Sequence, residues 1–153
     1  MRRPLMSFFV LLGLVLAVGT GKAQAQIIGE MEADIPFQFH VGDTRLPAGK
    51  YLIKALGDSD LAVMEITSAD GRISALFEVH GTQADTRPTK TELVFDKYGD
   101  QYFLSKLFDE GTKQGIQVQE SHYQKILSKG ETPGEASRVP AHPPGAAGGV
   151  TAH

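Results

Sequence analysis

The histidines are the residues best suited to metal chemistry. The chain has five His, and three of them, His40, His80 and His122, fall in segments with a regular hydrophobic pattern. Imidazole is a common zinc ligand, so a cluster of these three side chains would form a metal site. No two of them have the i, i+2 or i, i+4 spacing that places two ligands on one element. We therefore expect surface or helix-packing roles for them and no metal site; they are metal candidates only if folding brings them together.

Motifs for other catalytic chemistries are missing. Residues 58–60 begin like a calcium loop but lack its later Gly and Glu, and none of the seven Ser after residue 25 lies in a Gly-x-Ser-x-Gly motif. The glycines mark turns rather than a phosphate-binding loop, so we expect no cofactor. Glu65, Glu78, Glu92 and Asp96 lie on expected strands, where only folding could create a hydrolytic pair. A non-enzymatic protein is therefore predicted, and a hydrolase or metal-dependent enzyme with a site assembled in the fold is the alternative.

Two segments indicate a binding surface. Residues 102–108 form the most apolar stretch after residue 25, and an exposed aromatic patch typically lines a pocket or a protein contact. Residues 81–90 are polar and form the longest expected internal loop, an element that often carries function on β scaffolds. The candidate surface consists of Tyr102, Phe103, Phe108, Arg87 and Lys90. Core packing is nevertheless the favoured role for the aromatic residues, because a chain without Trp or Cys draws its bulk from Phe and Tyr.

Composition limits the class of protein. The chain has 153 residues, 41% hydrophobic and 22% charged, which is typical of one globular domain. It has no Cys, which excludes disulfides, a thiolate nucleophile and a Cys-type zinc site. The fold must therefore be held by its core alone.

The first 25 residues have the pattern of a signal peptide. Arg2 and Arg3 precede an apolar run over residues 5–18, which is too short for a comfortable membrane span. Ala23 and Ala25 place small residues where signal peptidase reads the chain. We expect cleavage before Gln26, export to the periplasm or outside the cell, and no membrane span in the mature chain.

The charge balance argues against nucleic acid as a partner. After residue 25 the chain retains 12 basic and 18 acidic residues. Nucleic-acid binding requires a concentrated basic surface. A net acidic chain with scattered Lys and Arg is a poor candidate for this class.

Period-two alternation predicts strands over most of the remaining chain. Pro36 lies in the first strand and cannot donate a ladder hydrogen bond, which indicates an edge or the start of a strand. Asp70-Gly71 is the clearest hairpin signal. The expected strands cover residues 33–41, 50–56, 61–68, 73–80, 91–98, 101–108 and 115–119.

Residues near the end of the patterned region change to helical spacing. A helix is expected over residues 120–129, with Ser121 available as its cap. Residues 130–153 are rich in Pro, Gly and Ala and are predicted to be a disordered tail, because they have few large side chains to bury. The expected organisation is a signal peptide (1–25), a lead (26–32), a β-domain with a C-terminal helix (33–129) and this tail.

Short connections between six or seven strands predict a mostly antiparallel all-β fold. The expected architecture is a small β-sandwich or a partly open barrel with a short C-terminal helix, and the sequence does not choose between the two.

Several motifs together resemble a group of small exported bacterial proteins of unknown function. The resemblance covers residues 33–129 and rests on F-x-F-x-V-G-D from Phe37, L-P-A-G-x-Y from Leu46, L-V-F from Leu93 and Y-G-D-x-Y-F-L-S from Tyr98. It implies the same fold class and export, and it implies no activity for any residue.

The leading functional hypothesis is a non-enzymatic periplasmic or secreted β-domain that binds a protein partner or a small ligand. The enzyme named above is one alternative. A structural envelope component that associates with itself through an edge strand is the other.

Overall fold

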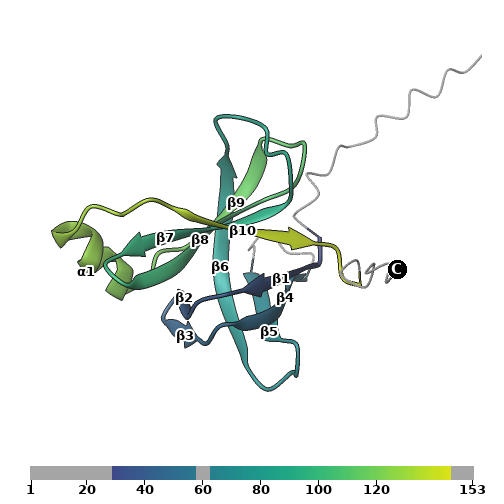
Figure 1. Cartoon of the computed structure of the whole chain (residues 1–153), viewed down its shortest axis with the longest axis horizontal. Coiled ribbons are helices and arrows are strands. Elements are labelled where there is room, and N and C mark those ends of the chain that lie inside the picture. The colour runs from purple at the N-terminus through teal and green to yellow at the C-terminus, as the bar shows by residue number, and fades with distance from the viewer. Residues whose placement is uncertain (1–28, 58–62, 146–153) are drawn as a thin grey trace, which may run out of the picture.

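A computed structural model describes residues 29–57 and 63–145 of the chain (Figure 1). These residues form an all-β structure with one short helix, which confirms the predicted fold class. Its elements are β1 (Met31–Ile35), β2 (Phe39–Val41), β3 (Thr44–Leu46), β4 (Gly49–Leu56), β5 (Val63–Ser68), β6 (Ser74–Gln83), β7 (Glu92–Tyr98), β8 (Gln101–Phe108), β9 (Gln114–Val118), α1 (His122–Gly130) and β10 (Ser137–His142).

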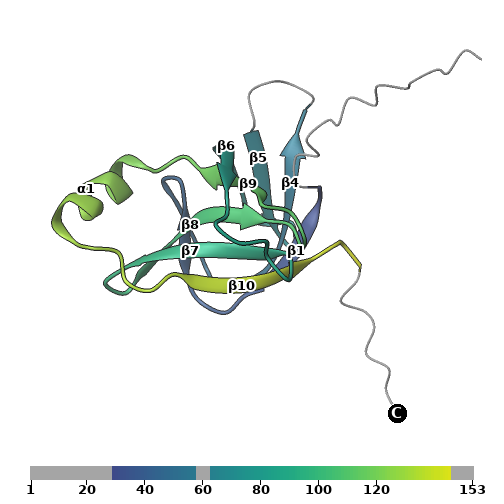
Figure 2. The same cartoon turned by 90° about the horizontal axis from the view of Figure 1, so that it is seen from above.

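Eight of the strands close into a barrel. Around the barrel the order is β8-β7-β10-β1-β4-β5-β6-β9, and β9 pairs again with β8. Figure 2 shows β7, β8 and β10 side by side along one wall. The choice between sandwich and partly open barrel, which the sequence left open, is thus resolved as a closed barrel.

The first expected strand is divided in two at Pro36. β1 ends at Ile35 and pairs with β4 and β10, whereas β2 begins at Phe39 and pairs with β3 and β8. Pro36 has no N–H, so a break at this residue removes no donated ladder hydrogen bond. This division, the hairpin β2–β3 and the added strand β10 explain why the described residues form more strands than the six or seven expected.

One edge of β8 is shared by two partners. β2 pairs in parallel with Tyr102 and Phe103, and β9 pairs with the other end of β8, from Lys106 to Phe108. Between these two pairings the ladder with β7 skips Ser105, because Phe95 is opposite Leu104 and Val94 is opposite Lys106. Such a bulge bends the strand and changes which residues face inward.

The barrel interior is filled with apolar side chains. Inward-facing residues alternate with outward-facing ones along β1, β4, β5 and β6, as a strand buried on one face requires. Phe39, Phe95, Ile53 and Leu107 are 0% exposed. A void large enough for a ligand would leave accessible surface on these side chains, so the interior is a packed core.

The structure differs from the predicted disordered tail. Residues 137–142 form β10, which pairs with β7 on one side and β1 on the other. Val139 and Ala141 point into the core. The prediction of disorder depended on the small number of large side chains. A strand that lies between two others also gains backbone hydrogen bonds from both neighbours, even though Pro140 has no N–H to donate. Residues 146–153 of the predicted tail lie outside the described residues, as does the predicted signal peptide.

The helix agrees closely with the sequence prediction. α1 begins after Ser121, whose hydroxyl accepts a hydrogen bond from the Gln124 amide at 3.0 Å. It packs over the hairpin end of β7 and β8, at the left of Figure 1. No helix in residues 29–57 and 63–145 is long and apolar enough to cross a membrane.

The turns in the described residues also agree with the sequence prediction, except at the longest loop. The hairpin between β5 and β6 turns at Asp70 and Gly71, where Gly71 has φ 69° and the Asp70 carboxylate accepts from the Ser68 hydroxyl and the Arg72 amide. These hydrogen bonds hold the pKa of Asp70 below its usual range. The expected loop over residues 81–90 is shorter at its start, because β6 continues to Gln83 along β9.

Candidate functional site

The predicted aromatic surface is divided among three places. Tyr102 is half-buried and stacks on Phe37, with ring centroids 4.0 Å apart. Phe103 is 1% exposed and lies on the outer wall beneath α1, near Tyr123. Phe108 is 5% exposed on the outer wall at the far end of β8. Most of these aromatic side chains are therefore buried, which is the packing role that the sequence favoured for them.

The three candidate histidines do not form a metal site in the structure. His40 stacks on Phe103 at 4.7 Å between ring centroids. Burial, with the nearby Arg45 charge as a second cause, lowers the pKa of His40. His80 is exposed on β6, and His122 is exposed at the start of α1. Within the described ranges, no three His, Asp or Glu side chains gather in a way that could hold a metal ion.

A groove lies between the loop after β6 and the outer wall of the barrel. We call it the loop groove; it has a volume of about 360 Å³. The loop contributes one side, and the outer faces of β7, β8 and β10 contribute the other. Its lining residues are Gln83, Ala84, Asp85, Thr86, Arg87, Pro88, Thr89, Glu92, Lys106, Phe108 and Arg138.

Hydrogen bonds to the β8–β9 turn fix the loop over this groove. The Ala84 amide donates to the Lys113 carbonyl at 2.8 Å, and the Gly111 amide donates to the Pro88 carbonyl at 2.9 Å. The Lys113 ammonium donates to the Asp85 carbonyl at 2.8 Å. A loop held in this way loses little further freedom when a ligand binds, which favours affinity.

The wall of the groove contains a buried carboxylate. Glu92 precedes the inward-facing Leu93 and therefore points outward, yet its side chain is only 7% exposed. It forms an ion pair with Arg138 of β10, whose side chain is 57% exposed. Removing the Glu92 carboxylate from water is unfavourable, and the partly exposed Arg138 guanidinium compensates that cost.

A glycine on β9 makes room for the aromatic residue of the groove. Gly115 is opposite Phe108 in the β8–β9 ladder. A Cβ atom at Gly115 would lie 2.3 Å from the Phe108 ring and 2.6 Å from the Leu107 carbonyl oxygen. The ring therefore lies over the glycine and against the barrel wall.

Sequence reasoning identified part of this groove. It named Arg87 and Phe108, which line the groove, and Lys90, which is exposed and does not line it. It missed Lys106 as a groove residue, although its outward position could be inferred once the bulge was known. It also missed Arg138, because the residue lies in the segment expected to be disordered.

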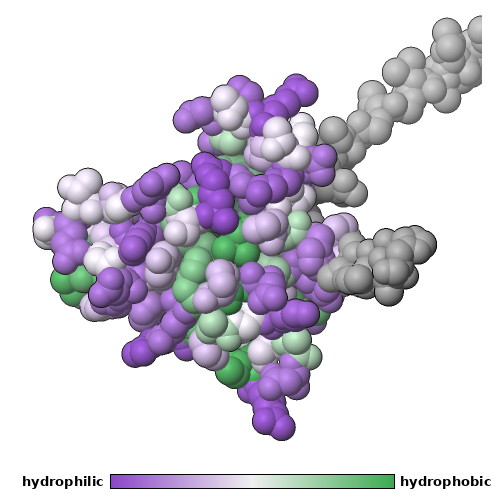
Figure 3. Space-filling view, in the orientation of Figure 1, coloured by the Kyte–Doolittle hydropathy of each residue, from purple (hydrophilic) through white to green (hydrophobic). Residues whose placement is uncertain are grey.

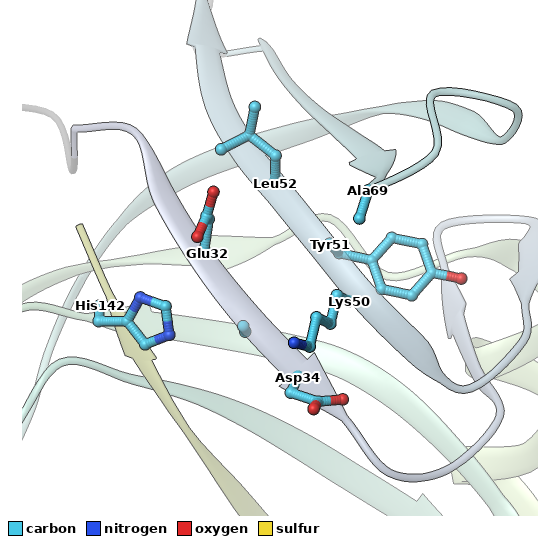
Figure 4. A pocket seen from close by; sticks show the side chains of 8 residues that line it. Glu32, Asp34, Lys50, Tyr51, Leu52, Ala69 and His142 are labelled. Carbon is cyan, nitrogen blue, oxygen red and sulfur yellow. The ribbon is translucent and has the colours of Figure 1, made fainter. Parts of the chain in front are cut away.

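A second groove lies on the outer wall near the other end of β10. We call it the strand groove; its volume is about 310 Å³. Figure 4 shows Glu32 and Asp34 on β1, with His142 on the β10 side and Lys50 on the β4 side. In the ladders, Glu32 is opposite His142, and Asp34 is opposite Lys50. No sequence pattern indicated this grouping, since His142 was also assigned to the tail.

The two grooves differ in how deeply their charged groups lie. In the strand groove, Asp34 and Lys50 are exposed, and Glu32 and His142 are half-buried. In the loop groove, Glu92 is buried and Lys106 is half-buried, whereas Asp85, Arg87 and Arg138 are exposed. Electrostatic interactions are stronger where water is excluded, so the loop groove is the better candidate for selective binding.

Among the described residues, exposed hydrophobic side chains form no site comparable to the two grooves. Hydrophilic residues cover most of the face in Figure 3. Among the described residues, the large hydrophobic side chains that are exposed are Leu76 on β6 and Tyr123 and Ile126 on α1.

Comparison of the chain with protein-family models, with curated proteins and with solved structures finds no significant match in any of the three. The geometry of the outer wall is therefore the basis for inferring the function.

Proposed function

We propose that the chain is an exported, non-enzymatic β-barrel domain that binds a small ligand in the loop groove. The observation that carries this proposal is the buried Glu92 carboxylate on the outer wall, ion-paired with Arg138 beneath a loop that hydrogen bonds hold in place. The packed interior leaves the outer wall as the surface for binding.

The size of the groove supports a small ligand over a polymer. Ligand pockets typically have volumes of about 300–1,000 Å³ and combine an apolar surface with a few polar groups. The loop groove falls in this volume range, but its lining is more polar than usual, with charged residues, the hydroxyls of Thr86 and Thr89, and Phe108 as its aromatic residue.

Export is part of the same proposal and rests on sequence alone. The basic start, the short apolar run and the Ala-x-Ala site of residues 1–25 support it. The absence of Cys means that the domain needs no particular redox environment to fold.

Native mass spectrometry of the protein, recovered from the exported fraction of its own cells, tests both parts. We expect a chain that begins at Gln26 and carries a small adduct. A Thr89→Trp variant should lose the adduct, because Thr89 lines the groove. Lys90→Trp is the matched control and should retain it, because the neighbouring Lys90 does not line the groove. An adduct that both variants retain would place the ligand elsewhere and contradict the proposal.

A second candidate function is acid–base catalysis in the strand groove. The grouping of Glu32, Asp34 and His142 favours it, because carboxylates and imidazole are the usual proton-transfer groups. This candidate predicts a hydrolytic activity that is lost in His142→Asn and kept in His80→Asn. Equal activity in the two variants would exclude the strand groove as its source.

Self-association through an edge strand has less support. In the described part of the chain, barrel closure leaves the outer side of β3 unpaired, and this strand has only three residues with Thr44 and Arg45 exposed. Short, charged edges resist edge-to-edge pairing. A molecular mass in solution that rises with concentration would restore this alternative.

A further inference from the structure

We propose that the ligand of the loop groove carries an oxyanion group, a carboxylate or a phosphate, bound by Arg87 and Lys106. This inference rests on the function proposed above and specifies the chemistry of the ligand. Three cationic side chains, Arg87, Lys106 and Arg138, line the groove with two acidic ones, Asp85 and Glu92.

The cations of the groove differ in their partners. Arg138 is ion-paired with Glu92. Lys106 and Arg87 form no ion pair with any other described residue. Two cations thus remain available to a ligand, in a chain with an excess of acidic residues.

Lys106 is positioned by the bulge in β8. Because the ladder skips Ser105, Lys106 is opposite Val94 of β7 and Gln117 of β9, and its side chain points outward into the groove. It is half-buried, its ladder partners Val94 and Gln117 carry no charge, and no carboxylate of the described residues forms an ion pair with it. Partial removal of an ammonium group from water is unfavourable without a counter-charge, and an oxyanion would supply that charge.

Arg87 approaches the same groove from the loop. Its backbone position is fixed because the adjacent Pro88 carbonyl accepts from the Gly111 amide. A guanidinium binds carboxylate and phosphate through two parallel hydrogen bonds, whereas an ammonium acts as a point charge. A cation on each side of the groove is suited to an anion held between loop and wall.

The Glu92–Arg138 pair has a separate role in this arrangement. Because Arg138 already neutralises Glu92, the buried carboxylate does not cancel the charge of Lys106 or Arg87. It holds the Arg138 guanidinium on the wall and limits the net positive charge, which favours a small anion over a highly charged polymer.

The test is a titration of the full mature chain, followed by the backbone amide signals of residues 83–87 and 89 in nuclear magnetic resonance. The probes are inorganic phosphate, malonate, neutral glycerol and cationic choline, all at one ionic strength. We expect phosphate or malonate to shift these amide signals with saturation, and glycerol and choline to leave them in place. Whichever anion binds more tightly identifies the oxyanion.

Charge-removing variants locate the site. Lys106→Gln and Arg87→Gln should each weaken anion binding about tenfold. Lys90→Gln is the matched control, because it removes the same charge from the same loop outside the groove, and its affinity should be unchanged. Equal weakening in all three variants would mean general charge attraction and would overturn the proposal.

The remaining outcomes separate this inference from the proposed function. If glycerol or choline shifts the groove amides and neither anion does, the anion proposal fails and the loop groove stands as a binding site. If no probe shifts them and the protein from its own cells carries no adduct, both proposals fail.

Discussion

The two faces of β7 and β8 are built from the same strands and have opposite character. Leu93, Phe95, Leu104 and Leu107 point inward and are at most 1% exposed. The outward residues at the same end include the charged Glu92 and Lys106. Side-chain volume determines which residues fit on the inner face. The outer face accommodates charged residues because the loop covers it only in part.

The largest expected effect comes from the inner face. Phe95→Ala removes a fully buried ring that contacts Phe37 and Phe39 edge to face, at 5.0 and 5.4 Å between centroids. The free energy of unfolding should fall by about 3–5 kcal/mol, measured by urea denaturation. Leu76→Ala, at an outward residue that is 61% exposed, is the control and should change it by less than about 0.5 kcal/mol. Equal losses of unfolding free energy in the two variants would contradict the difference between the two faces.

A smaller effect is expected where the outer face is tightly packed. Gly115→Ala places a Cβ against the Phe108 ring and the Leu107 carbonyl and should destabilise the fold by about 1–3 kcal/mol. Gly81→Ala is the control, since a Cβ there meets no atom within 4 Å. The double variant Gly115→Ala/Phe108→Ala should lose less stability than the sum of the two single losses, because the added Cβ no longer meets the ring. If the loss of stability in the double variant equals the sum of the two single losses, the ring does not lie over the glycine.

The outer ion pair should have a still smaller effect. Arg138→Met leaves Glu92 buried without its partner and should cost about 1–2 kcal/mol of unfolding free energy. The double variant with Glu92→Gln should recover stability, because no buried charge remains. The control is Arg72→Met, which breaks an exposed pair at 3.7 Å and should be close to neutral. A double variant less stable than Arg138→Met would mean that Glu92 is stabilised by other groups.

The smallest effect is a pH dependence on the outer wall beneath α1. Burial and the Arg45 charge lower the pKa of His40 in the folded protein, so the unfolded chain binds the proton more readily. Stability is therefore full above the ordinary His pKa and is lost as pH falls through it towards the folded value. His40→Gln should reduce this loss between pH 7 and pH 5, measured as the thermal midpoint, whereas the exposed His80→Gln should not. If the thermal midpoint changes equally with pH in both variants, the pH dependence comes from other groups.

Local elements were predictable from the sequence because their causes are local. The alternation in β4, β6 and β7 identified those strands, Asp70-Gly71 identified a hairpin, and Ser121 identified the start of α1. These features depend on residues a few positions apart, through side-chain direction, turn conformation and capping. The candidate site was only partly predictable, since Arg87 and Phe108 were named while Lys106 and Arg138 were not.

The sequence by itself determined the strand and turn pattern, the helix and the all-β class, because each follows from short-range periodicity and backbone preference. The tertiary structure decided the closure of the barrel, the ordering of β10 and the two grooves. β10 has only Val139 and Ala141 to bury, and it is a strand because β1 and β7 offer hydrogen bonds on both of its edges. That pairing joins residues more than forty positions apart, and it brings Arg138 and His142 to the outer wall of the barrel.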